Sequence, residues 1–240
     1  MPVKPSTLPP LIAIVGCDGS GKSTVSEEIL AWARGYGPAA ITHLGKQQGN
    51  TGRSISKLPL VGKFLGRFIA RKASTVHKSR TVNKAPDTFP AIVMSAFTLK
   101  RVRRFRRMMA LRQKGLIIIA DRYPQLDIPG TSDSTDMSVA AQGNRFVRWL
   151  AQREQAAFKW MTSYRPDLVI RLNVDIDTAF ARKPDHSREG LERKIRNIPQ
   201  LTFNGAPITE IDATQPLAEV VAAAKAAVTQ TLTEHGYDRS

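Results

Sequence analysis

Cysteine is nearly absent from this sequence, since Cys17 is the single one in 240 residues. One cysteine excludes an internal disulfide framework and a zinc site built on cysteines. Long apolar runs are absent too: no stretch of 18 apolar residues occurs, which excludes a membrane-spanning helix. The first ten residues lack the apolar core of a secretory signal peptide. Together these absences predict a soluble cytoplasmic protein.

Acidic residues are also scarce. The chain has 36 basic residues and 20 acidic ones, which gives a formal net charge of +16. Such an excess favours anionic partners, namely nucleotides, nucleic acid or an acidic membrane surface, and does not choose among them. The hydrophobic share of 42% is that of a globular protein, and the length suits one large α/β domain.

A phosphate-binding loop is the strongest motif that the chain does contain. Residues 16–23 fit the pattern G-x-x-x-x-G-K-[ST], in which glycines let backbone N–H groups surround a phosphate chain. Lys22 is placed to reach the β and γ phosphates and Ser23 to bind Mg²⁺. An apolar run at 11–15 predicts a buried strand before the loop, and the spacing of residues 23–32 predicts a helix after it. A glycine-rich connector without a ligand is the alternative. We assign no catalysis to Cys17.

A second apolar run, at 116–120, ends in Asp121. An aspartate at the carboxyl edge of a parallel sheet is where a P-loop enzyme places a magnesium-site carboxylate. A helix-capping aspartate is the alternative interpretation. Arg122 and Tyr123 follow directly.

Strand and helix patterns alternate along the chain, which predicts an α/β fold with a parallel sheet. We expect a loose arm over residues 1–10 and a single domain over 11–240. The long loop at 124–137 is expected to be functional. The predicted strands are 11–15, 39–44, 116–121, 168–174 and 207–212. The predicted helices are roughly 23–35, 91–114, 139–163, 177–181, 191–198 and 216–232.

Two helical segments, at 57–72 and 91–114, carry crowded basic residues beside an apolar stripe. Each is either a packed helix with a solvated basic face or an element for an anionic surface or substrate. Apolar positions at helical spacing are the predicted core contacts of the helices. These are Ile92, Ala96, Leu99, Val102, Phe105 and Met109, then Phe146, Leu150, Ala157 and Trp160, and finally Leu217, Val220, Val221, Ala224 and Val228.

The ordered motifs resemble the thymidylate kinase family of P-loop kinases. Four stretches carry the resemblance: residues 16–24, the Asp-Arg-Tyr motif at 121–123, residues 166–174 and residues 211–214. The resemblance implies a P-loop NTPase fold with a five-stranded parallel sheet in the order 2-3-1-4-5. It also implies a basic lid at about 182–195, and ATP with Mg²⁺ as cofactors.

The resemblance also assigns roles to individual residues. Asp18 would contact a sugar hydroxyl of the acceptor and Arg122 its phosphate, while an arginine near Lys100 or Arg101 would assist. The implied catalytic residues are Lys22, Asp18, Arg122, Arg182 and Arg188, with Arg193 as a further lid candidate. The implied nucleotide-binding residues are Gly16, Asp18, Gly19, Ser20, Gly21, Lys22, Ser23, Thr24 and Ala213. The implied metal ligands are Ser23 and Asp121.

The sequence departs from the family pattern where the acceptor base would lie. Residues 138–143 place Ala141 at a position that the family fills with tyrosine, and a long insertion precedes it. We therefore expect dTMP to be a poor acceptor. His43, His77, His186 and His235 are given no role.

Three hypotheses for the function remain. The first is a kinase that uses ATP and an anionic small-molecule acceptor, such as a nucleoside monophosphate. The second is a kinase of a polynucleotide, glycan or lipid-linked acceptor, and the third is a non-enzymatic NTP-dependent switch. A homodimer, and peripheral contact of the basic helices with an anionic membrane or nucleic acid, stay open.

Overall fold

The computed structural model describes residues 8–45, 87–140 and 144–239. Within these ranges, five parallel strands form one sheet in the order β2-β3-β1-β4-β5. The strands are β1 (Leu11–Gly16), β2 (Ala39–His43), β3 (Ile117–Asp121), β4 (Leu168–Asn173) and β5 (Ile208–Asp212). This arrangement confirms the predicted α/β class and the strand order of a P-loop NTPase.

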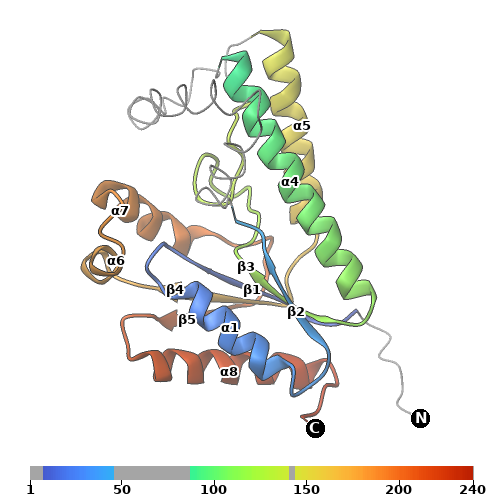
Figure 1. Ribbon diagram of the computed structural model, residues 1–240, viewed down its shortest axis with the longest axis vertical. Helices are drawn as coiled ribbons and strands as arrows, with labels where there is room; N and C mark the ends of the chain where they lie inside the picture. The colour runs from blue at the N-terminus through green and yellow to red at the C-terminus, as the bar shows by residue number, and fades with distance from the viewer. Residues whose placement is uncertain (1–7, 46–86, 141–143, 240) are drawn as a thin grey trace, which may run out of the picture.

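Helices cover both faces of the sheet, as Figure 1 shows. One face carries α1 and α8 side by side, and the other carries α4 and α5, while α6 and α7 follow the carboxyl end of β4. The helices are α1 (Lys22–Ala33), α4 (Thr88–Gln113), α5 (Arg145–Thr162), α6 (Ile176–Arg182), α7 (Arg188–Asn197) and α8 (Leu217–Glu234), with a short 3₁₀ helix at Ile198–Gln200. With helices on both sides, strands must be apolar on both faces, which explains the continuous apolar runs of β1 and β3.

The central strands place the candidate functional loops together at the carboxyl ends of the strands. In β1, Ile14 lies opposite Asp121 of β3 and opposite Ile170 of β4. The strands are parallel, so the chain leaves all of them at the same edge. The loop after β1, the Asp-Arg-Tyr motif after β3 and the α6–α7 segment after β4 therefore converge there.

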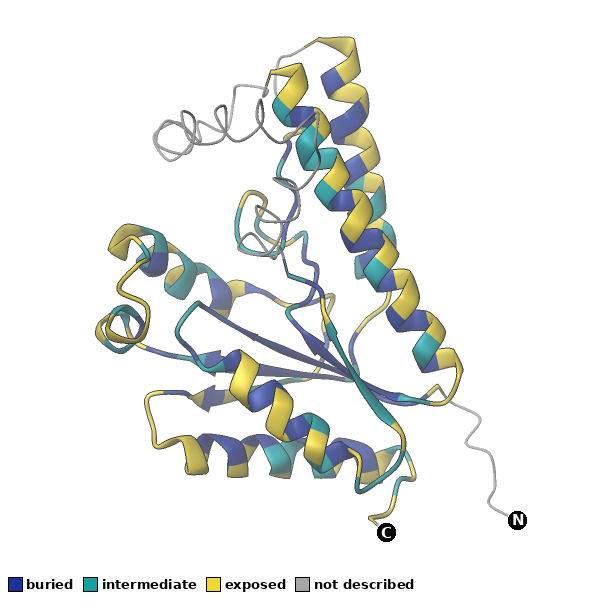
Figure 2. Ribbon diagram, viewed as in Figure 1, coloured by how far each residue is buried: buried dark blue, intermediate teal, exposed yellow. Residues whose placement is uncertain are grey.

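Helices α4 and α5 extend together beyond the sheet as an arm (Figures 1 and 2). The prediction is wrong at five positions that are exposed: Ile92, Ala96 and Leu99 of α4, Phe146 of α5 and Leu217 of α8. In the arm each helix has mainly the other helix to pack against, so only a narrow inner stripe is covered. Leu217 is the first residue of α8 and points outward.

The start of α5 also differs from the prediction. We expected a helix from residue 139, but α5 begins at Arg145 because the side chain of Asn144 caps it. The Asn144 side chain accepts a hydrogen bond from the backbone N–H of Val147 at 2.8 Å. This contact satisfies one of the amides that a helix leaves free at its N-terminus.

Two predictions concern residues outside the described ranges: the basic helix at 57–72 and the place of Ala141 beside the acceptor base. Pro9 and Pro10, which we expected in a loose arm, are buried just before β1. The Pro9 carbonyl accepts a hydrogen bond from Arg112, and the Pro10 carbonyl accepts one from Ile118 N–H. Among the described helices, none is long and apolar enough to cross a membrane.

Candidate functional site

The loop between β1 and α1 has the tight backbone that its glycines predict. A Cβ on Gly16 would lie 2.7 Å from the Leu172 carbonyl oxygen, so a side chain does not fit there. Gly19 has a φ of +88°, and a Cβ on it would lie 2.8 Å from the Ala179 carbonyl oxygen. Both glycines are therefore required by close backbone approach and not only by flexibility. The loop leads into α1, whose N-terminus has no side-chain cap.

An uncapped helix N-terminus with a nearby lysine is a favourable place for a phosphate chain. Lys22 is buried, and its Nζ donates a hydrogen bond to the Cys17 carbonyl inside the loop. Burial, followed by the charge of Arg122, lowers the pKa of Lys22 to about 8. Ser23 and Thr24 are exposed at the first turn of α1. Burial raises the pKa of the Cys17 thiol, which agrees with assigning it no catalysis.

Asp121 ends β3 beside this loop. Its Oδ2 lies 2.9 Å from Nδ1 of His43, the residue opposite it on β2. Its Oδ1 is buried and has no hydrogen-bond partner among the described residues. Because an unpartnered buried carboxylate oxygen is costly, this atom is suited to accept a contact from a bound ion or its water. The contact with His43 was not expected from the sequence.

Asp18 of the loop is held between two cations from distant parts of the chain. Arg122 Nη2 lies 2.7 Å from Asp18 Oδ1, and Lys194 Nζ of α7 contacts Asp18 Oδ2. His186 Nε2 lies 3.8 Å from the same Oδ2. Burial would raise the pKa of Asp18, but the hydrogen bond from Lys194 and the charge of Arg122 hold it well below the ordinary value. Asp18 is therefore a carboxylate at neutral pH.

Arg122 adopts a backbone conformation that is unusual for a residue with a side chain, with a φ of +68°. Strain of this kind clusters at functional sites, where the surroundings hold it in place. A Cβ on Gly45 would clash with the Arg122 side chain, so Gly45 makes room for it. Burial would lower the pKa of Arg122, but the carboxylates of Asp133 and Asp18 raise it above the ordinary value.

Asp133 joins Arg122 to helix α4. Its Oδ2 lies 3.5 Å from Arg122 Nη1, and its Oδ1 lies 3.3 Å from Arg101 Nη2. Arg101 is buried, and its guanidinium lies over the Phe158 ring, whereas Lys100 is exposed. Of the two positions that the sequence left open, the structure therefore brings Arg101 to this cluster.

The two arginines of the predicted lid lie in different surroundings. Arg182 Nη1 donates to the Gly19 carbonyl at 3.3 Å and to the Ala213 carbonyl at 2.9 Å. This joins the loop after β1, the end of α6 and the turn after β5. Arg188 instead pairs with Asp177 at 2.7 Å, within the α6–α7 segment itself.

Lys194 is one of the residues that the sequence analysis missed. Leu191 and Ile198 are buried and Ile195 packs against the core, which defines the inner side of α7. Lys194 lies next to Ile195 on this side and so reaches Asp18, while Arg193 is exposed. The helical spacing of the three apolar residues was the signal that could have found it.

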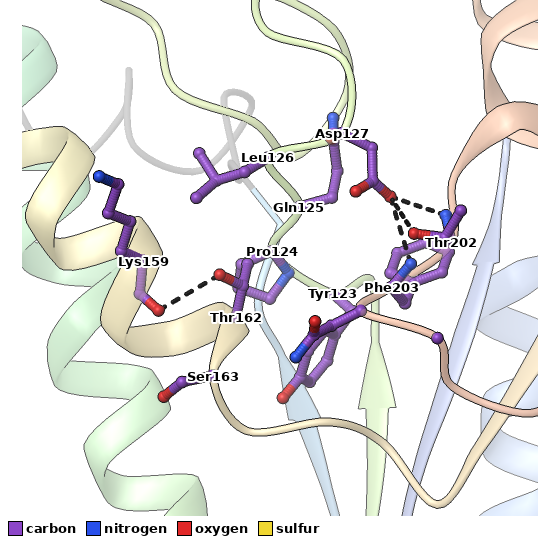
Figure 3. A pocket seen from close by; sticks show the side chains of 12 residues that line it. Tyr123, Pro124, Gln125, Leu126, Asp127, Lys159, Thr162, Ser163, Thr202 and Phe203 are labelled. Atoms are coloured by element: carbon purple, nitrogen blue, oxygen red, sulfur yellow. Dashed lines mark hydrogen bonds between the residues drawn. The ribbon is translucent and has the colours of Figure 1, made fainter.

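A separate cavity of about 490 Å³ lies between residues 123–127, the last turn of α5 and residues 202–205 (Figure 3). On one side of it, Asp127 accepts hydrogen bonds from the backbone N–H groups of Thr202 and Phe203. Residues 124–127 of the long loop and Tyr123 line it, but none of the residues assigned to catalysis, nucleotide or metal does. Among the described residues, no group of three or more His, Cys, Asp or Glu side chains gathers to hold a metal ion.

The strand order and the glycine loop at the edge of the sheet define an α/β protein of the P-loop NTPase fold. The chain is 41% identical over 219 residues to the uncharacterized ATP-binding protein YghS of Escherichia coli K12, covering 91% of this chain and 92% of YghS. It is 38% identical over 226 residues to the uncharacterized ATP-binding protein YghR of the same strain, covering 94% of this chain and 89% of YghR. The chain therefore belongs to the family of YghS and YghR.

A scan against models of protein families gives no match for this chain. Neither relative is described as a thymidylate kinase. Membership of the thymidylate kinase family therefore stays a prediction, which rests on the motifs in the sequence alone.

Proposed function

We propose that the chain is an ATP-dependent phosphotransferase that moves the γ-phosphoryl group to an anionic small molecule. A nucleoside monophosphate or a related phosphorylated compound is the acceptor class that we favour. The names of YghS and YghR support ATP as the nucleotide. The loop at residues 16–23 supports it too, through its glycine backbone and Lys22.

One observation carries the proposal beyond nucleotide binding: Asp18 is held by Arg122 and Lys194, which come from two other elements. A protein that only binds a nucleotide needs cations on the phosphates, but not a second charged cluster beside them. Phosphoryl transfer needs both, because catalysis relies on positioning two anionic substrates and on cationic stabilisation of the transition state. This weighs against a non-enzymatic switch.

The proposed roles follow the placement of the side chains. Lys22 and Arg182 would bind the phosphates of ATP from two sides of the loop. Arg122, supported by Arg101 through Asp133, would bind the phosphate of the acceptor. Asp18 would accept a hydrogen bond from an acceptor hydroxyl and so orient it.

The residues that were predicted to hold Mg²⁺ fit this ion. Asp121 offers a buried oxygen without a partner among the described residues, and Ser23 offers an exposed hydroxyl at the start of α1. Both supply oxygen, the ligand that Mg²⁺ prefers, and the remaining positions would be filled by phosphates and water. When bound, the ion would reduce the repulsion between the phosphate chain and the incoming acceptor.

The organisation of the chain is part of the proposal. We infer one kinase domain over residues 11–240, in which the basic segment at about 182–195 acts as the lid. Its contacts to Gly19 and Asp18 support this, because they connect the segment to the phosphate loop.

A screen for the acceptor tests the proposal. Release of ADP from ATP and Mg²⁺ would be measured with a panel of nucleotides, phosphorylated sugars, glycans, lipid-linked sugars and nucleic acids. We expect at least one phosphorylated small molecule to stimulate ADP release, and dTMP to be a poor acceptor, with kcat/KM below about 10⁴ M⁻¹s⁻¹. Tight ATP binding without stimulation by any member would favour a switch instead.

A further inference from the structure

Helices α4 and α5 pack side by side along the arm. They run in the same direction, since Asn144 bonds Thr88 at their starts and Thr98 bonds Glu154 further along. Closer to the sheet, the Arg106 guanidinium lies 5.6 Å from the Trp160 ring centroid. This contact fixes which edge of each helix lies beside the other.

Helical spacing shows which residues nearer the far end of the arm lie on the same side as Arg106 and Trp160. Seven residues make about two turns, so positions seven apart lie on the same side of a helix. Counting back from Arg106 gives Leu99 and Ile92 on α4, and counting back from Trp160 gives Arg153 and Phe146 on α5. Trp149, one turn before Arg153, completes the surface. We name it the outer seam: Ile92, Leu99, Arg106, Phe146, Trp149, Arg153 and Trp160.

The outer seam exposes large apolar side chains. The exposed fractions are 47% for Ile92, 51% for Leu99, 46% for Phe146 and 48% for Trp149. These four account for half of the exposed large hydrophobic residues of the described chain. Their concentration on one surface indicates an interaction site.

The exposed charge of helices α4 and α5 has a single sign. Exposed cations number four on α4 and four on α5. They are Lys100, Arg103, Arg106, Arg107, Arg145, Arg148, Arg153 and Lys159. The one carboxylate of the two helices, Glu154, is buried between them and bonds Thr98. A second copy of this chain would therefore bring like charges together here, whereas an anionic partner would match the surface.

The side chains favour a lipid surface over nucleic acid. Phosphate backbones gain nothing from Ile92 and Leu99, whereas the boundary between lipid headgroups and acyl chains accepts such residues. Base stacking needs a free aromatic face. The Trp149 ring already stacks on Phe146, at 6.0 Å between centroids, and carries the Arg153 guanidinium 5.3 Å from its centroid.

We propose that the outer seam binds the surface of an anionic phospholipid bilayer as a peripheral contact. The apolar residues of the seam enter the headgroup boundary, and the seam residues Arg106 and Arg153 contact lipid phosphates. The inference is independent of the proposed phosphotransferase activity.

Flotation of the full chain with vesicles tests this. The vesicles would be phosphatidylcholine alone, or phosphatidylcholine with about a third of phosphatidylglycerol. We expect binding to the anionic vesicles only, weakening as salt rises. Ile92→Ser with Leu99→Ser, and Arg106→Gln with Arg153→Gln, should each weaken partitioning by about tenfold or more. Arg34→Gln with Arg196→Gln is the matched control, since both arginines are exposed elsewhere and their loss should change little.

Tryptophan emission provides a second readout. Binding should shift the emission to the blue, and Trp149→Phe should reduce this shift while it retains vesicle binding. Circular dichroism and thermal melting would verify that each variant is folded.

Several results would overturn the proposal. These are equal binding to both kinds of vesicle, no binding to either, or seam variants that bind like the wild type. Binding of nucleic acid, or self-association, that is lost in the seam variants without any vesicle binding would assign the surface to that partner. A large fall in melting temperature in both seam variants, without vesicle binding, would mean that another part of the chain covers the seam.

Discussion

At the scale of single residues, the account depends on Asp18 and the charges around it. Its carboxylate would be costly to bury alone, yet Arg122 and Lys194 keep it ionised. Arg122 reaches it from a left-handed backbone position beside Gly45. The chain thus accepts backbone strain to bring a guanidinium next to its phosphate loop.

The contact between Asp18 and Lys194 leads to the first prediction. Lys194→Met should lower kcat/KM for the acceptor by about tenfold, and Asp18→Asn by about a hundredfold, because each removes one positioned charge. The double variant should be less impaired than the product of the two, with a coupling of about 1 kcal/mol for a partly exposed pair. Arg193→Met is the control, since Arg193 is exposed on the same helix. Fully additive effects would mean that the contact has no role in turnover.

Asp121 gives the second prediction. Asp121→Asn preserves the shape of the side chain and removes its charge next to the proposed magnesium site. Activity should fall by about a hundredfold or more, and the Mg²⁺ concentration for half-maximal rate should rise. A magnesium titration of both proteins checks this. An unchanged rate and an unchanged titration curve would leave Asp121 with only its contact to His43.

Single residues also mark how far the sequence could predict the site. Asp18, Lys22 and Arg122 were found because each belongs to a contiguous motif whose spacing has a chemical reason. Lys194 and His43 were not found, because their partners lie 176 and 78 residues away. Helical spacing could place Lys194 on the inner side of α7, but no local pattern names the distant partner of either residue, because such pairs form only once the strands are assembled.

At the scale of elements, the α6–α7 segment connects to the phosphate loop at two points. Arg182 bonds Gly19 at its start and Lys194 bonds Asp18 near its end. Arg188 lies between them and pairs with Asp177 of the same segment. The segment therefore contacts the loop after β1 through Arg182 and Lys194, but not through Arg188.

This difference yields the third prediction. Arg182→Ala should lower kcat by about tenfold or more, with a smaller rise in KM for ATP, because its contacts would form mainly in the transition state. Arg188→Ala should have the smaller effect, since its partners belong to its own segment. Steady-state kinetics of both variants measure this. The reverse ranking, or a change in KM alone for Arg182→Ala, would contradict the assignment.

The loop at residues 124–137 is anchored by a buried carboxylate of α5. Glu154 accepts hydrogen bonds from the backbone N–H groups of Asp136 and Met137 and from the Thr98 hydroxyl. Burial raises the pKa of Glu154, and the hydrogen bond from Met137 N–H opposes this. The loop carries Asp133, so this anchor also positions the partner of Arg122 and Arg101.

The fourth prediction concerns this anchor. Glu154→Ala would leave buried amides without a partner and should lower the free energy of unfolding by about 2–3 kcal/mol. For a chain of this size the melting temperature should fall by about 5–10 °C. Gln152→Ala, at an exposed position of the same helix, should have little effect. Equal melting temperatures for the two variants would show that the loop does not depend on Glu154.

The elements also show where sequence patterns are less informative. The central strands β1 and β3 were predicted closely, because a strand covered on both faces must be apolar throughout. The inner faces of α4 and α5 were predicted less well. Apolar residues such as Leu99 are exposed, because the arm extends beyond the sheet. Some charged residues are buried instead. Arg101 and Arg112 are buried against Asp133 and Asp167, which lie far away along the chain.

At the scale of the whole molecule, the sheet and the arm differ in what they present. The sheet gathers the loop after β1, the Asp-Arg-Tyr motif and the α6–α7 segment at one edge. The arm carries many of the basic residues that give the chain its charge of +16. We expect the first to perform the chemistry and the second to select where in the cell it happens.

Transfer of label from γ-labelled ATP to the isolated acceptor tests the central claim most directly. The account predicts that the wild type forms one labelled acceptor per ATP consumed. It predicts that Lys22→Ala, folded as judged by melting temperature, forms none that can be detected, because Lys22 neutralises the phosphates in transfer. Undiminished transfer by Lys22→Ala would contradict the account. So would a wild type that binds or hydrolyses ATP and labels no acceptor.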